Sequence, residues 1–190
     1  GKVRAIDGKA LRGTNKKGKS NSFVHMVSMW ACTEGLSLGM VKVDDKSNEI
    51  TAIPKLLKMI DIKGTIVTID AMGTQTAIAE QIQDNGGDYI LALKGNHSTF
   101  HDEVENFFNQ AEAVEFDGFE HSSYHVIEQG HGRTEKREVY VTEDIKWLPR
   151  KEEWKGLKSL IMIVSERTVK GVSSIFRHYY ISSLEGDART

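Results

Sequence analysis

The order of hydrophobic patterns along residues 1–113 constrains the fold of this chain more than any other feature. Three β-prone segments separated by short turns predict three consecutive strands, at residues 2–7, 23–32 and 36–43. The period then changes, because residues 47–60 carry apolar side chains at helical spacing. Two nearly all-apolar segments predict buried strands, and a helical pattern follows each of them: strands at 65–70 and 88–93, helices at 74–83 and 97–113. This order predicts an α/β fold in which an antiparallel meander runs into βαβ units, giving a mixed sheet flanked by helices.

The sequence after residue 113 is less regular and remains rich in β-prone segments. Strands are expected at four places: 124–129, 137–142, 160–164 and 176–181. A polar hairpin loop at 167–174 would join the last two strands. We interpret residues 114–175 as a β-rich insertion or extension of a single domain that spans residues 1–190, because no low-complexity linker divides the chain.

The charge of the chain is nearly balanced overall but not locally. The formal net charge is −2 over 190 residues, so no global field favours nucleic acid or an anionic membrane. Residues 1–20 nevertheless contain seven basic residues and one acid, Asp7. Such a cluster is typical of a surface that binds a polyphosphate, and a solvated basic loop is the alternative.

Several other classes of protein are disfavoured by what the sequence lacks. Its one cysteine, Cys32, can form neither a disulfide framework nor a cysteine-rich zinc site. No apolar run approaches the roughly 20 residues of a membrane span, and no signal-peptide pattern is present. We therefore expect no membrane partner and a cytoplasmic location.

Residues 13–20, GTNKKGKS, match the phosphate-loop pattern G-x-x-x-x-G-K-[ST]. In a nucleotide hydrolase a buried strand leads directly into this loop, and a helix follows at once so that its N-terminus faces the phosphates. Here the preceding strand is predicted to end near Asp7, and the residues after Ser20 predict another strand. A P-loop nucleotide hydrolase is therefore the less favoured alternative, and we interpret GTNKKGKS as a lysine-rich turn between two antiparallel strands.

Asp7 and Asp70 each close a predicted strand, and a small residue, Gly8 or Ala71, follows each of them. If the two strands are neighbours, the carboxylates meet at one edge of the sheet and repel unless a proton or a cation is shared. Mg²⁺ or Mn²⁺ in a two-metal site would remove that repulsion and could act on a phosphodiester. Strand-end aspartates are also common turn formers and helix caps, so either residue alone has a purely structural interpretation.

Six phrases, in this order, are similar to one protein family: AIDGKALRG, KSNEI, VTIDAMGTQ, GGDYILALKGN, HGRTEKR and RHYYISSL. From about Val3 to Leu184 the chain resembles the ISAs1-type insertion-sequence transposases, which include the H-repeat-associated proteins. The resemblance implies a ribonuclease-H-like fold and a DDE-type catalytic core that acts on double-stranded DNA, both transposon ends and target. It also implies a bacterial, nucleoid-associated protein, and it leaves a homodimer open.

In this resemblance the first two acids of the family fall on Asp7 and Asp70, which would be catalytic and would hold the metal ions. The third acid of the family lies on a helix in a segment resembling H-W-x-I-E-N, which does not occur in these 190 residues. We therefore expect the third-acid helix beyond residue 190, and we expect this fragment to be inactive alone. Glu135 in HGRTEKR is a candidate substitute, but its position between Arg133 and Arg137 favours a role in organising or pairing with those arginines.

The activity that the resemblance implies is that of a polynucleotidyl transferase: metal-dependent DNA strand cleavage followed by strand transfer. DNA contacts are expected from a set of basic and amide residues: Lys9, Arg12, Lys16, Lys17, Lys19, Lys94, Asn96, Arg133 and Arg137. A catalytically inactive DNA-binding remnant or an accessory module is the alternative function.

Overall fold

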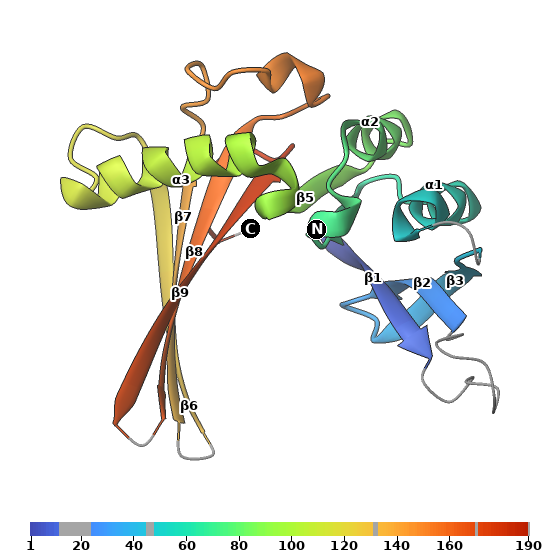
Figure 1. Ribbon diagram of the computed structural model, residues 1–190, viewed down its shortest axis with the longest axis horizontal. Coiled ribbons are helices and arrows are strands. Elements are labelled where there is room, and N and C mark those ends of the chain that lie inside the picture. Colours follow the sequence, from blue (N-terminus) through green and yellow to red (C-terminus); the bar gives the residue numbers. More distant parts are fainter. Residues whose placement is uncertain (12–23, 45–47, 131–132, 170, 190) are drawn as a thin grey trace. The chain divides into compact units, whose positions relative to one another are not determined.

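The computed structural model describes residues 1–11, 24–44, 48–130, 133–169 and 171–189 (Figure 1). The chain forms two compact units, the first comprising residues 1–91 with 154–156 and the second comprising residues 92–153 with 157–190. The described residues form a mixed α/β structure with three α-helices, which is the class that the sequence predicts. None of these helices combines the length and the apolar character needed to cross a membrane. The interpretation of residues 1–190 as a single domain stays a prediction.

Five strands form the sheet of the first unit, in the order β3-β2-β1-β4-β5. Their bounds are β1 (Lys2–Leu11), β2 (Val24–Ala31), β3 (Leu36–Lys42), β4 (Thr65–Ile69) and β5 (Asp88–Leu93). The first three strands are antiparallel neighbours, whereas β4 pairs in parallel with both β1 and β5. The predicted change from an antiparallel meander to parallel strands is therefore confirmed.

Two α-helices, α1 (Glu49–Met59) and α2 (Thr76–Asp84), belong to the first unit, together with the 3₁₀ turn η2 (Ala71–Gly73). The apolar spacing that predicts α1 forms its buried face, because Ile53, Leu56 and Leu57 are each at most 3% exposed. This face packs on β2 and β3. Burial of large aliphatic side chains at about 25 cal/mol per Å² is the main term that fixes a helix on a sheet, so the position of α1 follows from its pattern.

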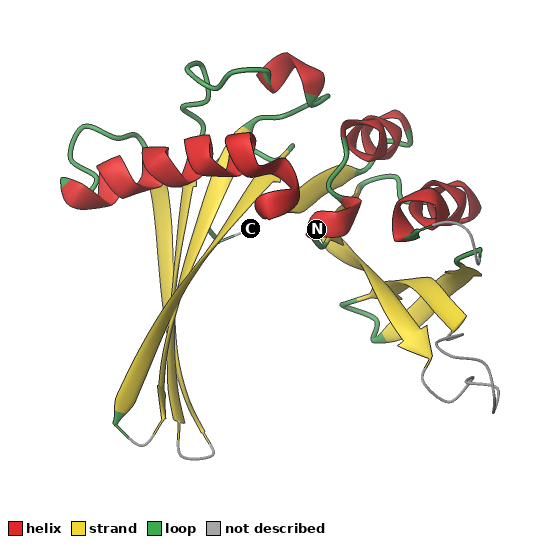
Figure 2. Ribbon diagram, in the orientation of Figure 1, coloured by secondary structure: helices red, strands yellow, loops and turns green. Residues whose placement is uncertain are grey.

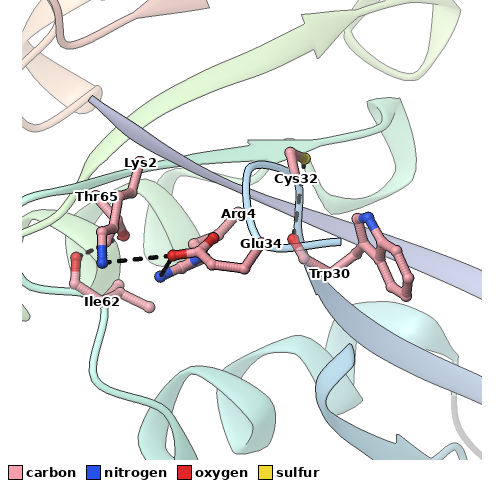
Figure 3. Close-up of polar contacts among 7 residues, drawn as sticks. All are labelled: Lys2, Arg4, Trp30, Cys32, Glu34, Ile62 and Thr65. Carbon is pink, nitrogen blue, oxygen red and sulfur yellow. Dashed lines mark hydrogen bonds and ion pairs between the residues drawn. The ribbon is translucent and has the colours of Figure 1, made fainter. Parts of the chain in front are cut away.

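An ion pair fixes the start of β1 (Figure 3). Arg4 is only 8% exposed, and its Nη1 donates a 2.7 Å hydrogen bond to Oε2 of Glu34, in the turn between β2 and β3. Figure 3 shows the Glu34 carboxylate between Arg4 and Lys2, whose Nζ lies 3.4 Å from Glu34 Oε1. The hydrogen bond from Arg4 lowers the pKa of Glu34 to about 2. The charge of this buried arginine is therefore balanced within the unit.

The second unit contains an antiparallel sheet in the order β9-β8-β7-β6 and the helix α3 (Ser98–Ala113). The strands are β6 (Ser122–Gly130), β7 (Arg133–Thr142), β8 (Ser159–Val169) and β9 (Val172–Ser182). Two short 3₁₀ turns also belong to it, η3 (Gly95–His97) and η4 (Lys151–Glu153). All four strands occur where the sequence predicts strands, although each one is longer than predicted.

The predicted hairpin loop at 167–174 is wrong. β8 and β9 continue to pair through this segment as far as Val169↔Val172, so most of the predicted loop is strand. Gly171 has a φ of +79°, a conformation that favours glycine. Polar residues that suggest a loop instead form a hydrogen bond between the two strands. Thr168 Oγ1 and Ser173 Oγ lie 2.7 Å apart.

Helix α3 covers one half of the sheet of the second unit, as Figure 2 shows for the red helix over the yellow strands. In that half Leu160, Met162 and Ile181 are fully buried, and Phe108 of α3 stacks on Tyr179 with ring centroids 6.0 Å apart. In the other half the apolar side chains of β9 are more than half exposed: Val172, Ile175 and Phe176. The core of this unit therefore lies between α3 and the covered half of the strands.

The prediction that the first strand ends near Asp7 is also wrong, because β1 continues to Leu11 with β2 as its partner, in the register Leu11↔Val24. Residues 13–20, which match the phosphate-loop pattern, lie outside the described residues. The described strands on either side of them, β1 and β2, are antiparallel partners. A phosphate loop needs a helix directly after it, so the strand that follows disagrees with a nucleotide hydrolase.

Candidate functional site

Asp7 and Asp70 occupy equivalent positions on neighbouring strands of the first unit. β1 and β4 run parallel, and their register ends with the pair Ile6↔Ile69. Asp7 and Asp70 are the next residue on each chain segment, and both are exposed. Neighbouring strands lie about 4.8 Å apart, so the backbones bring these two acids to the same end of one ladder. The expectation that the first and fourth predicted strands are neighbours is confirmed.

Asp70 is exposed, but the turn that follows it is closely packed. The Asp70 carboxylate accepts a 2.6 Å hydrogen bond from the backbone N–H of Ala71, which makes Asp70 the N-cap of η2. Gly73 ends this turn, and a methyl group there would collide with Ile69 and with Ile53 of α1. The turn after β4 is therefore held between the sheet and α1, and this packing gives Asp70 a defined backbone position.

Asp7 lies at the point where β1 loses one of its two neighbours. β1 still pairs with β2 there, in the register Asp7↔Ser28, but its ladder with β4 has ended at Ile6. From Asp7 onward none of the described strands pairs with the edge of β1 that faces β4. Among the described residues, none forms an ion pair or a side-chain hydrogen bond with Asp7.

The residue after Asp7 brings a further carboxylate into this region. Gly8 lies beside the side chain of Glu49, the first residue of α1, and a methyl group at Gly8 would collide with the Glu49 carboxyl group. Glu49 is not among the site residues predicted from the sequence, although it lies in the phrase KSNEI. Its signal is faint, because an acid in the first turn of a helix is common wherever the helix dipole favours it.

The predicted DNA-contacting residues are only partly described. Lys9 is exposed and lies two residues after Asp7 on β1, so both side chains are on the same face of the strand. Lys94 and Asn96 follow β5 and are exposed residues of the second unit. Four further predicted residues lie outside the described residues: Arg12, Lys16, Lys17 and Lys19.

Glu135 lies on β7 in the second unit, where arginines surround it. Its Oε2 accepts a 2.7 Å hydrogen bond from Nη2 of Arg137, and its Oε1 lies 3.8 Å from Nε of Arg167. Arg137 also donates a 2.9 Å hydrogen bond to Glu128. Arg133 begins β7, opposite Gly130 and Val169. The structure thus shows Glu135 and Arg137 as members of a charge network across the strands.

Helix α3 carries a group of possible metal ligands that was not predicted from the sequence either. His101, Asp102 and Glu105 offer atoms that lie within 4.8 Å of one another. The His101 ring makes an edge-on contact with Tyr179, with centroids 5.3 Å apart, and its Nδ1 lies 3.5 Å from Asp102. The i, i+4 spacing of His101 and Glu105 is the signal in the sequence, whereas the position of Asp102 at i+1 gives none. The ring packing and local pairing explain these contacts without a ligand.

The chain is similar to a known protein family. A family model described as "Transposase DDE domain" matches residues 1–188. The match therefore includes both units and all the acids considered above.

Individual relatives agree with the family match. A protein of Xanthobacter autotrophicus, named "Uncharacterized protein in dhlA 3'region", is 40% identical over 183 residues, which are 96% of this chain and 60% of that protein. The "H repeat-associated putative transposase YhhI" of Escherichia coli (strain K12) is 42% identical over 189 residues, covering 96% of this chain and 49% of the relative. The "Putative transposase YncI" of Escherichia coli O157:H7 is 41% identical over 194 residues, covering 100% of this chain and 49% of the relative. This chain thus spans about half the length of the latter two relatives.

Proposed function

The chain belongs to the transposase DDE-domain family, as its resemblance to insertion-sequence transposases predicts, and from this premise we propose that it carries the metal-dependent catalytic core of a DNA transposase. In the proposed reaction, water first cleaves one DNA strand at the end of an element and releases a 3′-hydroxyl. That hydroxyl then attacks a target phosphodiester, forming one new phosphodiester and releasing another 3′-hydroxyl. The observation that carries the proposal is the equivalent position of Asp7 and Asp70 at the end of the β1–β4 ladder.

Asp7 and Asp70 are the residues that would hold the divalent ions, Mg²⁺ or Mn²⁺. A DDE domain implies divalent metal, and carboxylate oxygens are the ligands that these hard cations prefer. The donor set fits, because two exposed acids lie at the same end of one ladder. When bound in a two-metal site, the ions would stabilise the attacking and leaving oxygens of the phosphodiester. The hydrogen bond from Ala71 would hold one Asp70 oxygen in a fixed direction.

DNA is the proposed partner, and Lys9 is the described residue best placed to contact it near the acids. Lys9 shares one face of β1 with Asp7, so it would contact a backbone phosphate close to the reacting one. The exposed Lys94 and Asn96, and the basic residues between 12 and 19, would add contacts that position the duplex. We further propose that the fold is ribonuclease-H-like, which the antiparallel meander followed by parallel strands supports.

The metal site is tested by titrating Mn²⁺ into the chain in a calorimeter. We expect the unchanged chain to bind Mn²⁺ weakly, and we expect Asp7→Asn and Asp70→Asn each to abolish most of the heat. Glu80→Gln is the matched control, since Glu80 is an exposed acid of α2 in the same unit and should have no effect. Unchanged binding by both aspartate variants would contradict the proposed site.

The activity is tested on the whole protein with supercoiled plasmid and Mn²⁺. We expect metal-dependent nicking that both aspartate substitutions remove, together with joining of a supplied 3′-hydroxyl end to the plasmid. A protein that binds DNA but neither binds Mn²⁺ nor nicks the plasmid would instead be an accessory DNA-binding module.

A further inference from the structure

The start of α1 brings a third carboxylate to the strand that carries Asp7. Asn48 is the N-cap residue of α1, and Glu49 is the first helical residue. The helix is anchored on β2 and β3 by its buried apolar face, so its N-terminal turn has little freedom to move away. In this position the Glu49 carboxyl group lies against Gly8.

The glycine at position 8 is what permits this contact. An added methyl group would collide with the carboxyl carbon and with both carboxyl oxygens of Glu49. The φ of Gly8 is not among the positive values found in this chain, so backbone conformation does not explain the glycine. Because Gly8 has no side chain, there is room for Glu49 of α1 to approach the strand directly after Asp7.

The open edge of β1 gives these acids a common place to meet. The ladder between β1 and β4 stops at Ile6, and Asp7 and Gly8 follow immediately. Side chains alternate along β1, so the Asp7 side chain and the Gly8–Glu49 contact lie on opposite faces of the strand. A cation shared by Asp7, Asp70 and Glu49 would therefore lie beside this edge of β1, between the two faces. Among the described residues none forms an ion pair with Asp7 or Glu49.

The favourable interaction of an acid with the helix dipole is the competing explanation for Glu49. It accounts for a negative residue in the first turn of α1, with about 0.3–1 kcal/mol of stabilisation at an exposed site. It does not account for a carboxyl group placed against the backbone of another element, at the residue that follows Asp7. The dipole is also satisfied when the glutamate faces solvent, which would leave position 8 open to any small residue.

We propose that Glu49 is a third carboxylate ligand of the divalent cation held by Asp7 and Asp70, an inference that rests on the proposed function. In this structure the carboxylate oxygens of Asp7, Asp70 and Glu49 do not all lie within 4.8 Å of one another. Among the described residues, that spacing occurs at His101, Asp102 and Glu105. Three carboxylates repel one another without a cation. Binding therefore includes a rotation of the Glu49 and Asp7 side chains toward the ion, with the backbones of β1 and α1 fixed.

Calorimetric titration of Mn²⁺ into Glu49→Gln tests this assignment without relying on activity. We expect the affinity to fall roughly tenfold or more, as it does when groups at a metal site are changed. Glu80→Gln, which makes the same chemical change elsewhere in the unit, should bind Mn²⁺ like the unchanged chain. Thermal unfolding without metal should show that Glu49→Gln is folded and loses no more than the small dipole contribution.

The salt dependence of Mn²⁺ binding distinguishes a metal ligand from a charge that acts only at a distance. A negative charge that acts only through space is largely screened at about 0.5 M KCl, where the Debye length is only about 4–5 Å. The loss caused by Glu49→Gln should persist there if the carboxylate binds the ion. A loss that disappears in salt would overturn the assignment.

Gly8→Ala supplies a second variant, because its methyl group would displace the Glu49 carboxyl group. It should weaken Mn²⁺ binding in the unchanged background and have little further effect in Glu49→Gln. If Asp7→Asn and Asp70→Asn lose binding but Glu49→Gln does not, the inference on Glu49 fails and the proposed function stands. If none of the three acids affects Mn²⁺ binding, the proposed metal site fails as well.

Discussion

The candidate catalytic acids of the two units, Asp7 and Glu135, differ in what balances their charge. In the second unit Glu135 accepts a hydrogen bond from Arg137, and Glu112 of α3 accepts two from Arg177 of β9, at 2.9 and 3.1 Å. In the first unit Asp7 and Glu49 lie near the end of the β1–β4 ladder, and no described residue forms an ion pair with either. An acid with a fixed guanidinium already has its counter-charge, whereas an acid without one can bind a cation from solution.

The first unit also contains an acid of the paired kind, which makes the comparison sharper. Glu34 is held by Arg4, three residues before Asp7 on the same strand. In the first unit, therefore, an arginine pairs with Glu34, whereas no described residue forms an ion pair with Asp7. We infer that this difference separates structural acids from those available to a metal ion.

The largest expected effect is on DNA cleavage by the whole protein. Asp7→Asn should lower the rate of Mn²⁺-dependent plasmid nicking roughly a hundredfold or more, because it removes a ligand of the ions that stabilise the reacting oxygens. Glu135→Gln should lower it less than about threefold, because that acid is occupied by Arg137. Equal losses in the two variants would break the comparison and would restore Glu135 as a catalytic candidate.

The part of this site that the sequence could predict is the part encoded by strand patterns. Ile6 and Ile69 end apolar stretches, and Asp7 and Asp70 follow them, so two neighbouring strands suffice to bring the acids together. The helices α1 and α2 were predicted to within a few residues, because their apolar spacing corresponds to buried faces. Periodic burial is a strong signal, so helices and strands that depend on it can be located from the sequence.

The contacts that escaped prediction join residues far apart in the sequence. Glu49 approaches Gly8, and Arg4 pairs with Glu34, only because a particular helix or turn is positioned against a particular residue of β1. No periodicity encodes that placement. The extension of β1 past Asp7 was missed for a similar reason: a polar, lysine-containing segment continues as a strand when β2 supplies its hydrogen bonds.

The second expected effect is on stability in the presence of metal. At Mn²⁺ concentrations about ten times the dissociation constant, binding should stabilise the unchanged chain by roughly 1.4 kcal/mol. The melting temperature should therefore rise with Mn²⁺ in the unchanged chain and in Glu135→Gln, but not in Asp70→Asn. A rise that survives in Asp70→Asn would place the bound ion elsewhere, with His101, Asp102 and Glu105 the first group to test.

The third expected effect is on acid unfolding. The pKa of Glu34 is about 2 when folded, against its ordinary 4.5, because Arg4 donates a hydrogen bond to its charged form. The unfolded chain therefore binds a proton more readily between these values. The contribution of Glu34 to stability is complete above pH 4.5 and is lost as the pH falls toward about 2.

Urea unfolding across this pH range measures that contribution. The free energy of unfolding of Glu34→Gln should depend less steeply on pH than that of the unchanged chain, since the substituted side chain does not titrate. Glu135→Gln should retain the contribution of Glu34. Identical pH slopes in Glu34→Gln and the unchanged chain would show that Arg4 does not perturb Glu34.

The smallest expected effect concerns a paired acid of the second unit. Glu112→Gln should lower the free energy of unfolding by about 0.5–1 kcal/mol, because a partly exposed ion pair contributes little even with two hydrogen bonds. Glu128→Gln, which alters the more exposed partner of Arg137, should cost less, since the Glu128 side chain is 62% exposed and that of Glu112 is 27% exposed. Urea unfolding at low and high salt measures both, and screening should reduce both losses. A loss at Glu112 well above this range, or a loss that salt leaves unchanged, would mean that the Glu112–Arg177 pair holds α3 on β9 through burial rather than charge. The paired acids of the second unit would then be part of its core and not balanced surface charges.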